Sequence, residues 1–419
     1  MEAVYQPFQG LCFNAAESFV SYRAFFLLSL GGRNTGDILK ILVNSIPMAG
    51  VLTGVARYLR NLYTAMGRMD RMDISYFKGR SPVDFIGVAA NSARRQNASR
   101  TARYFPDPVV FGLRAASRLK YEYFLNRACK KKGRPGFDVY HETAFTPAKQ
   151  TRVPTVYSVY DLSLRRFRET QPRDRVWLFE CFIKSRLRYA DHVLTISEFI
   201  RQEIIDEFKL QPSMVTAVPL APDPLFAPCS EHLVEKVRHK YKLPRSYLLF
   251  VSSLEPRKNI DLLINALMIS STDIPLVLVG WKGWGQKKWR EKIKDRQLAN
   301  RIIMTGHIPD HDLRAVYSGA RALVYPSLYE GFGLPIVEAM ACDCPVICSN
   351  AASMPEAAGN AAVLVNPYSS DEFAHAIDTI VHDSRVRDEL VKKGRAQAAA
   401  FTWRKTAGQT VEVFKKVIK

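Results

Sequence analysis

Short apolar segments that alternate with helix-like segments are the feature that most restricts the fold of this chain. The first unit is an apolar strand at residues 38–44, followed by a glycine-containing turn and by a helix at 55–66 with apolar residues at helical spacing. Similar strands with β-branched residues are expected at 139–141, 153–160 and 192–196. Strands that alternate with helices predict a parallel sheet covered by helices on both faces, the doubly wound α/β class.

The strand–helix pattern starts again after a proline-rich stretch at residues 219–228. Strands of the second set are expected at 247–251, 275–280, 301–305, 322–325 and 346–349. One hydrophobic core stops growing near about 250–300 residues, so a chain of 419 residues is expected to hold two domains. We predict an extension at 1–37, an N-terminal domain at 38–222, a C-terminal domain at 223–400 and a final helix at 401–419.

The composition excludes several classes of protein. An apolar fraction of 47% excludes global disorder, and no apolar run reaches the roughly 18–20 residues that cross a bilayer. Residues 1–18 contain no Lys or Arg, so a secretory signal is not expected. The seven cysteines are then expected to be reduced thiols, and the cluster of Cys342, Cys344 and Cys348 lacks the spacing of a metal site.

The most informative stretch runs from residue 326 to 340, where a strand is followed by glycines and by a helix with proline in its first turn. Free N–H groups at such a helix start, together with the helix dipole, favour an anion such as a diphosphate. Gly331 and Gly333 let the backbone approach a ligand closely. Glu330 precedes the turn and Glu338 lies about one turn into the helix, so both carboxylates can face one ligand.

Two other strand ends indicate the same chemistry. Arg257 and Lys258 follow the strand at 247–251, and adjacent cations there can neutralise a diphosphate and stabilise it as a leaving group. Gly306 lies at the end of a later strand, where it gives backbone access to a nucleobase, with His307 beside it. Two phosphate-oriented elements in one domain predict a nucleoside diphosphate as the ligand.

The segment from Glu330 to Glu338 resembles the Glu-x7-Glu motif of the retaining glycosyltransferases of family 4, which have the GT-B fold. Other segments resemble that family in order and spacing, namely ILVNSIPMAGVLTGVARYLRNL, ISEFIRQEI, FVSSLEPRKNI, TGHIPDHDL and SNAASMPEAAGNAA. The resemblance covers roughly residues 38–410 and is nearest to bacterial mannosyl- and rhamnosyltransferases of lipopolysaccharide or exopolysaccharide synthesis. It implies two Rossmann-like domains that face each other across a cleft, and a C-terminal helix that crosses back to the N-terminal domain.

The resemblance also implies roles for individual residues. Glu338 would bind the ribose hydroxyl groups of the donor, and Glu330 would lie near the transferred sugar. Arg257 and Lys258 would bind the diphosphate. The implied donor-binding residues are Gly54 beside the phosphate, Ser253, Gly280, His307, Ile308 beside the base, Phe332, Gly333 and Leu334 with their backbone amides, and Glu338. The implied catalytic residues are Glu330, Arg257, Lys258, Tyr160 and Asp161.

Two positions depart from the family pattern. Ser253 lies where many relatives carry an arginine, and Arg257 is then expected to take that role. Tyr160 precedes Asp161 where the family usually reads His-Asp-Leu, and tyrosine is a poor base near neutral pH. The change is compatible with front-face transfer, in which the leaving phosphate takes the acceptor proton. His141 is another candidate near the cleft, with a structural role equally open.

Basic residues are concentrated between residues 87 and 136. Twelve basic residues minus two acidic ones give +10, which is half of the net charge of +20. Because aromatic and apolar residues are interleaved with the charges, this segment can lie on an anionic membrane or pack as an ordinary helix face on its own domain. Nucleic acid is the least expected partner, since no nucleic-acid-binding motif accompanies the charge.

We therefore predict a retaining hexosyltransferase, with mannose favoured, that uses a nucleoside diphosphate sugar and needs no metal or other cofactor. The acceptor is expected to be a glycan or a polyprenyl-linked glycan. The enzyme is expected in the cytoplasm, peripheral at the inner face of the cell membrane. The alternatives are a catalytically degenerate accessory subunit, motivated by Tyr160 and Ser253, and a phosphorylase or epimerase with the same fold.

Overall fold

The computed structural model describes residues 38–48, 54–83, 106–129, 136–150, 152–281, 283, 285, 287–293 and 296–418. The predicted extension at 1–37 lies outside the described residues, as do the loop at 49–53 and much of the basic segment at 87–136. The chain from Leu39 onward forms one compact unit.

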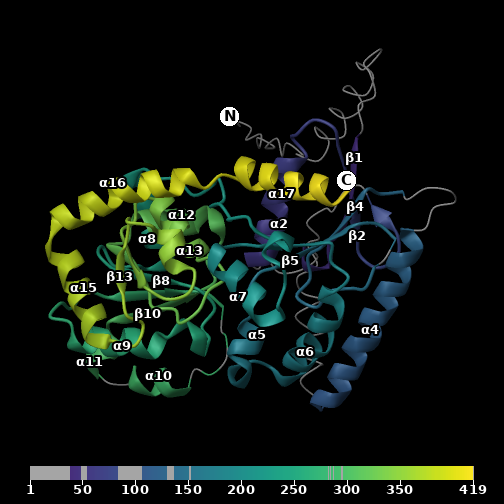
Figure 1. The fold of residues 1–419 in the computed structure, drawn as a ribbon. Coiled ribbons are helices and arrows are strands. Elements are labelled where there is room, and N and C mark those ends of the chain that lie inside the picture. Colours follow the sequence, from purple (N-terminus) through teal and green to yellow (C-terminus); the bar gives the residue numbers. More distant parts are fainter. Residues whose placement is uncertain are drawn as a thin grey trace, which may run out of the picture. The chain divides into compact units, whose positions relative to one another are not determined.

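The first half of this unit is built on a seven-stranded sheet with the strand order β3-β2-β1-β4-β5-β6-β7 (Figure 1). Its strands are β1 (Leu39–Asn44), β2 (Met72–Phe77), β3 (Pro82–Val83), β4 (Val139–Glu142), β5 (Thr155–Val159), β6 (His192–Thr195) and β7 (Val215–Ala217). Its helices are α2 (Gly54–Met66), α4 (Asp107–Ala128), α5 (Ser163–Arg166), α6 (Arg173–Leu187) and α7 (Glu198–Phe208). The strands pair in parallel except for β2 with β3.

The second half is built on a six-stranded parallel sheet with the order β10-β9-β8-β11-β12-β13. Its strands are β8 (Leu248–Val251), β9 (Leu276–Val279), β10 (Ile302–Gly306), β11 (Ala322–Tyr325), β12 (Val346–Ser349) and β13 (Val363–Val365). Its helices are α8 (Glu231–Tyr241), α9 (Ile260–Ile269), α10 (Lys287–Lys292), α11 (Arg296–Ala299), α12 (Asp310–Ser318), α13 (Leu334–Ala341), α14 (Met354–Ala358), α15 (Ser370–His382) and α16 (Ser384–Ala400).

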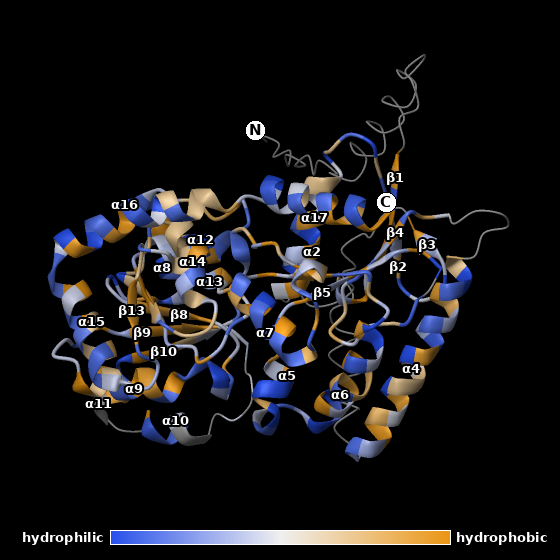
Figure 2. Cartoon of the chain, viewed as in Figure 1, coloured by the Kyte–Doolittle hydropathy of each residue, from blue (hydrophilic) through white to orange (hydrophobic). Residues whose placement is uncertain are grey.

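The sheets form because their strands are short, apolar and buried on both faces, as parallel strands between two layers of helices must be. β8, with the sequence LLFV, and β9, with LVLV, are coloured as hydrophobic in Figure 2 and are almost completely buried. Ser197 caps α7, since its side chain accepts a hydrogen bond of 3.2 Å from the Ile200 amide. The prediction of two doubly wound α/β units is confirmed.

The last helix, α17 (Trp403–Ile418), follows the second half but packs on α2 in the first half (Figure 1). The Trp403 indole donates to the carbonyl of Pro222 at 2.9 Å, and the Thr406 hydroxyl donates to the carbonyl of Pro219 at 2.8 Å. The predicted C-terminal helix that crosses back is therefore confirmed. None of the helices in the described part of the chain combines the length and apolarity that crossing a bilayer requires.

The order of the strands locates the site. It reverses between β1 and β4 in the first sheet and between β8 and β11 in the second. Ligands of open α/β sheets bind beyond the carboxyl ends of the strands at such a reversal. The loops that leave β8 and β11 carry Arg257, Lys258 and Glu330, so the predicted phosphate-binding residues lie at the expected place in the second sheet.

Candidate active site

A buried carboxylate, Glu330, joins the two loops that leave β8 and β11. Its oxygens accept hydrogen bonds from Lys258 Nζ at 2.5 Å, Arg257 Nη1 at 3.0 Å, Ser327 Oγ at 2.7 Å and Tyr325 Oη at 2.8 Å. Burial by itself would raise the pKa of Glu330, but Lys258 and Arg257 outweigh it and lower the pKa to about 2. Glu330 is therefore ionised at every physiological pH.

Arg257 is held between three carboxylates. Its guanidinium bonds Glu255 at 2.7 Å and Glu330 at 3.0 Å, and Asp161 from the first half of the chain also acts on it electrostatically. Burial lowers the pKa of Arg257, but the three carboxylates raise it by more, so the side chain stays charged. Arg257 also donates to the backbone carbonyl of Tyr329. Two fixed cations at the edge of a sheet can bind an incoming diphosphate.

The start of α13 provides backbone donors next to this cluster. Gly333 is the N-cap residue with a φ of 106°, a left-handed conformation that favours glycine. The helix begins at Leu334, and Phe332 is buried against the ring of Phe401. Because the first N–H groups of a helix have no partner within the helix, this end can bind an anion.

Glu338 lies one turn into α13 and is 2% exposed. One carboxylate oxygen accepts a bond of 2.6 Å from Arg57 on α2, and the other accepts a bond of 3.2 Å from the Tyr317 hydroxyl. Burial raises the pKa of Glu338, an effect that Arg57 only partly offsets. Each oxygen of the predicted ribose-binding carboxylate thus accepts one hydrogen bond from a side chain in this structure.

The predicted base side of the site lies at the ends of β9 and β10. His307 stacks on Trp281, with ring centroids 4.5 Å apart and an interplanar angle of 14°. Ile308 is buried. Gly280 has a φ of 148°, and a Cβ there would lie 1.8 Å from the carbonyl oxygen of Ser252, so only glycine fits. These contacts produce a flat aromatic surface at this edge of the sheet.

Three further predicted residues, Ser253, Gly54 and Asp161, make no hydrogen bond with Glu330. Ser253 is half-buried beside the β8 loop, and its carbonyl accepts a bond of 3.0 Å from the Glu255 amide. Gly54 is the exposed first residue of α2, directly after the loop at 49–53 that lies outside the described residues. Asp161 accepts a bond of 2.9 Å from the Ser163 amide.

Tyr160 brings the two halves of the chain together. Its hydroxyl is buried and donates to the carbonyl of Thr143 at 2.9 Å, and burial raises the pKa of Tyr160 well above the ordinary value. A Cβ on Gly331 would lie 2.2 Å from the Tyr160 carbonyl oxygen, so the Glu330 loop touches the Tyr160 strand end directly. A phenol with its proton committed to a backbone carbonyl is poorly suited to act as a base.

His141 occupies a structural position. It is completely buried, with its ring nitrogens hydrogen-bonded to the Tyr63 and Ser158 hydroxyl groups. Its ring packs edge-on against Phe414 of α17, with centroids 5.3 Å apart. Of the two roles that the sequence leaves open, these contacts favour the structural one.

Lowering the pH from 7 to 5 should destabilise the fold by about 2 kcal/mol through His141 alone. Burial lowers the pKa of His141 from 6.5 to about 3, so the unfolded chain takes up a proton that the folded chain does not. This contribution to stability is complete above pH 6.5 and is lost as the pH falls toward 3. Urea unfolding of the wild type and His141→Gln at both pH values measures it. Equal pH dependence of the two proteins would contradict the assignment.

Sequence reasoning missed several residues of the site. Tyr325 and Ser327 bind Glu330, Tyr317 and Arg57 bind Glu338, and Trp281 stacks on His307. Tyr325 could have been predicted as a site residue, because it is the last residue of a strand and the carboxyl ends of the strands face the site. Arg57 gave no such signal, since its partner lies 281 positions away along the chain.

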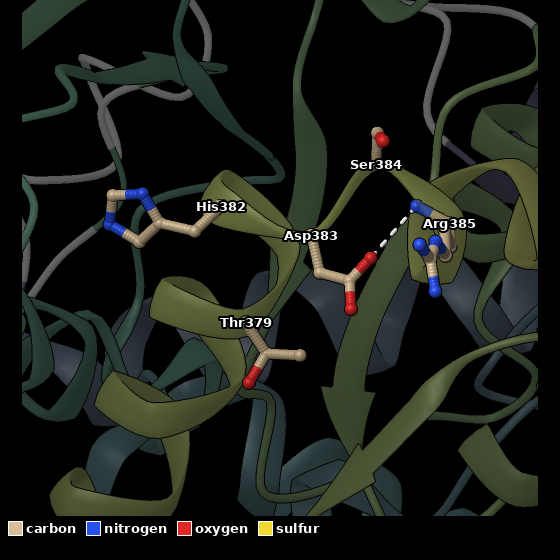
Figure 3. Close-up of a pocket in the computed structure, with 5 residues that line it drawn as sticks. All are labelled: Thr379, His382, Asp383, Ser384 and Arg385. Atoms are coloured by element: carbon tan, nitrogen blue, oxygen red, sulfur yellow. Dashed lines mark hydrogen bonds between the residues drawn. The ribbon is translucent and has the colours of Figure 1, made fainter.

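One pocket of the described surface, shown in Figure 3, lies apart from these residues. It is lined by Thr379, His382, Asp383, Ser384 and Arg385 at the turn between α15 and α16. Asp383 accepts a bond of 2.8 Å from the Arg385 amide and so caps α16. Neither this pocket nor any other part of the described chain contains a group of three or more potential metal ligands.

Comparison with known proteins identifies the family. The O-antigen chain mannosyltransferase B of Escherichia coli is 30% identical over 387 residues, which cover 90% of this chain and 100% of that protein. The chain belongs to glycosyltransferase family 4. Residues 52–224 of this glycosyltransferase match the model "Glycosyltransferase Family 4", and residues 234–397 match "Glycosyl transferases group 1". The MMP alpha-(1->4)-mannosyltransferase of Mycolicibacterium hassiacum is 29% identical over 75% of this chain and 76% of its own.

Solved structures support the fold of this family 4 glycosyltransferase. Sucrose-phosphate synthase from Thermosynechococcus elongatus superposes with a TM-score of 0.68 at 20% identity, covering 90% of this chain and 98% of that one. HepE from Anabaena, solved in complex with UDP-glucose, gives a TM-score of 0.65 at 19% identity over 90% of this chain and 100% of its own. The GT-B fold predicted from the sequence is confirmed.

Proposed function

We propose that this glycosyltransferase transfers a hexose, with mannose favoured, from a nucleoside diphosphate donor with retention of configuration. The acceptor is a glycan or a polyprenyl-linked glycan in the synthesis of a bacterial surface polysaccharide. Its family supports the transfer of a sugar, and the two mannosyltransferases that resemble it support mannose. The O-antigen chain mannosyltransferase, which it matches along the whole length of that protein, supports the surface polysaccharide.

The observation that carries the proposal is the cluster of Glu330, Arg257 and Lys258 beside the start of α13. The two cations lie where a donor diphosphate would meet free backbone N–H groups, and their charge would stabilise the diphosphate as it leaves. Glu330 holds both cations in one place, so the site is preorganised before the donor enters.

Retention follows in this proposal from front-face transfer. The bond between the anomeric carbon and the diphosphate oxygen breaks, and the acceptor oxygen bonds to the same face of the sugar. The acceptor proton passes to the leaving phosphate, so no side chain of the protein has to act as a base. The commitment of the Tyr160 hydroxyl to Thr143 supports this route over one with a tyrosine base. In this proposal no metal takes part, and the N–H donors of Arg257, of Lys258 and of the start of α13 stabilise the leaving diphosphate.

The test uses the purified full chain with labelled GDP-mannose, UDP-glucose, UDP-galactose and dTDP-rhamnose and a membrane fraction as acceptor. We expect mannose transfer that persists in EDTA and yields an α-linked product by NMR. Transfer of another sugar would replace mannose in the proposal. A β-linked mannose product would overturn retention, because the mannose of GDP-mannose is α-linked. An absence of both transfer and donor binding would favour the accessory-subunit alternative.

We also propose that the exposed face of α4 docks on an anionic membrane surface. Val109, Leu113, Leu119 and Tyr123 are 45%, 63%, 53% and 63% exposed, and apolar residues recur along α4 in Figure 2. Lys120 and Arg127 are exposed on the same helix. Apolar side chains among cations match the interface of an anionic bilayer. Two of the counted basic residues do not contribute, because Arg118 is buried on Glu142 and Arg114 pairs with Asp174.

Replacing Leu113 with serine should weaken binding to anionic vesicles about tenfold, since burying one leucine side chain is worth about 1.5–3 kcal/mol. Sedimentation with phosphatidylglycerol-containing vesicles measures the effect. Tyr368→Ser is the matched control, because Tyr368 is 80% exposed but lies on the second half of the chain. Equal binding of the two variants, or equal binding to neutral phosphatidylcholine vesicles, would refute docking through α4.

A further inference from the structure

Arg57 on α2 is the one side chain of the described first half that reaches the carboxylate of Glu338. Its Nη1 lies 2.6 Å from Glu338 Oε1, and its Nη2 lies 2.9 Å from Asp310 Oδ1 on α12. The Arg57 side chain is 17% exposed and the Glu338 side chain 2%. A helix of the first half is thereby tied to two helices of the second half through one guanidinium.

The Arg57 contact competes with ribose binding, the role that the family resemblance implies for Glu338. Each oxygen of Glu338 already accepts one bond, from Arg57 or from the Tyr317 hydroxyl, and the side chain is 2% exposed, so a ribose diol can reach the carboxylate only if a neighbouring group moves. We propose that Arg57 and the donor ribose compete for the carboxylate of Glu338. Donor binding must then displace Arg57 from Glu338 and break a contact between the two halves. This inference rests on the proposed function and, within it, on the ribose-binding role that the family resemblance implies for Glu338.

The surroundings of Arg57 make such an exchange feasible. Asp310 holds the second guanidinium nitrogen, so Arg57 can release Glu338 without losing its charge partner. The Nε atom of Arg57 is buried and has no hydrogen-bond partner among the described residues, so its present position does not use all its donors. Ribose hydroxyl groups can replace the N–H donors at Glu338, which leaves the carboxylate hydrogen-bonded before and after the exchange.

Displacement of Arg57 has a consequence for the reaction. The donor must break the ion pair between Arg57 and Glu338, so the energy of that pair lowers donor affinity. Because the pair joins α2 to α13, donor binding in turn weakens the contact between the two helices. Arg57 is therefore a positioning residue, because the contact between the two halves depends on whether Arg57 or the donor ribose bonds Glu338.

The matched control lies on the same helix. Arg60, one turn after Arg57, bonds Asp223 at 3.1 Å and is 36% exposed. It ties α2 to the segment between the two sheets and makes no bond with Glu338. Changing either arginine to methionine keeps the apolar stem and removes one guanidinium, so only the partner of the guanidinium differs between the variants.

Isothermal titration of the full chain with guanosine diphosphate tests the inference. We expect Arg57→Met to bind it about tenfold more tightly than the wild type, within the usual range of coupling between sites. Arg60→Met should bind it as the wild type does. Arg57→Lys, which keeps the charge but loses the paired geometry, should show a smaller gain. With 2′,3′-dideoxyguanosine diphosphate, which lacks the ribose hydroxyl pair, Arg57→Met should show no gain.

Three outcomes would overturn the inference. Unchanged or weaker binding of guanosine diphosphate by Arg57→Met would show that Arg57 does not compete with the ligand. An equal gain for the dideoxy compound would show that the competition does not involve ribose. An equal gain in Arg60→Met would show a general loosening of α2. If the wild type binds no nucleoside diphosphate of any base, the proposed function itself is wrong, and the inference fails with it.

Discussion

Glu330→Ala should abolish sugar transfer and lower the free energy of unfolding by about 3–5 kcal/mol, the usual cost of removing one partner of a buried ion pair. The variant leaves Lys258 buried without its carboxylate and removes one of the partners of Arg257. Glu330→Gln, which keeps the shape and part of the hydrogen bonding, should lose activity with a smaller loss of stability. Urea unfolding and the initial rate of transfer measure the two effects separately.

The control for this prediction is an exposed ion pair. Glu235 pairs with Arg238 at 2.6 Å on the surface of α8, so Glu235→Ala should unfold at the same urea concentration as the wild type. If Glu330→Ala is as stable as Glu235→Ala, the buried cluster does not stabilise the fold. If polysaccharide synthesis in cells survives Glu330→Ala, the accessory-subunit alternative replaces the proposed transferase.

Gly331→Ala should lower kcat/KM by about 100-fold or more while nucleotide binding is largely kept. The added Cβ would lie 2.2 Å from the Tyr160 carbonyl oxygen and 3.0 Å from Ile196 Cδ1, both in the first half of the chain. The first of these is a backbone atom that cannot rotate away, so the two loops must separate. A displacement of about 1 Å between reacting groups costs on the order of 100-fold in rate. Kinetics and isothermal titration together test the prediction.

Gly408→Ala is the control for the effect of a methyl group alone. Gly408 lies inside α17, and a Cβ there would have no neighbour within 4 Å. Alanine in the interior of a helix is more favourable than glycine by about 1 kcal/mol, so this variant should be slightly more stable and fully active. Loss of nucleotide affinity in Gly331→Ala equal to its loss of rate would contradict a clash between the halves.

The second sheet was largely predictable because most of its strands are short and apolar, whereas β2, with Asp73 and Ser75, was not predicted. β11 and β12 begin and end where the sequence pattern predicts them. The sequence left open whether the basic segment packs on its own domain, because Arg118 and Glu122 lie on the buried face of α4 beside Tyr121 and Leu125. Ion pairs at buried positions conceal the apolar stripe from which a helix is normally inferred.

The grouping of the candidate site residues was predictable where these residues are local in sequence. Arg257, Lys258 and Glu330 belong to two short loops, and the spacing of each loop indicated an anion. Arg57 was not predictable, because its ion pair with Glu338 depends on how the two sheets lie against each other. The hydrogen bond from the Tyr160 hydroxyl to the Thr143 carbonyl could not be predicted either, since it depends on the path of the backbone near Thr143.

Tyr329, the residue before Glu330, belongs to the second half of the chain but is buried in a hydrophobic cluster made mostly of first-half side chains. Its hydroxyl donates to Glu203 and accepts from the Leu162 amide. An exchange of one whole domain with that of a relative would therefore have to transfer Leu162 and Glu203 together with the Tyr329 loop. A chimera joined only at the proline-rich stretch would leave the Tyr329 side chain, directly beside Glu330, without the residues that it packs against.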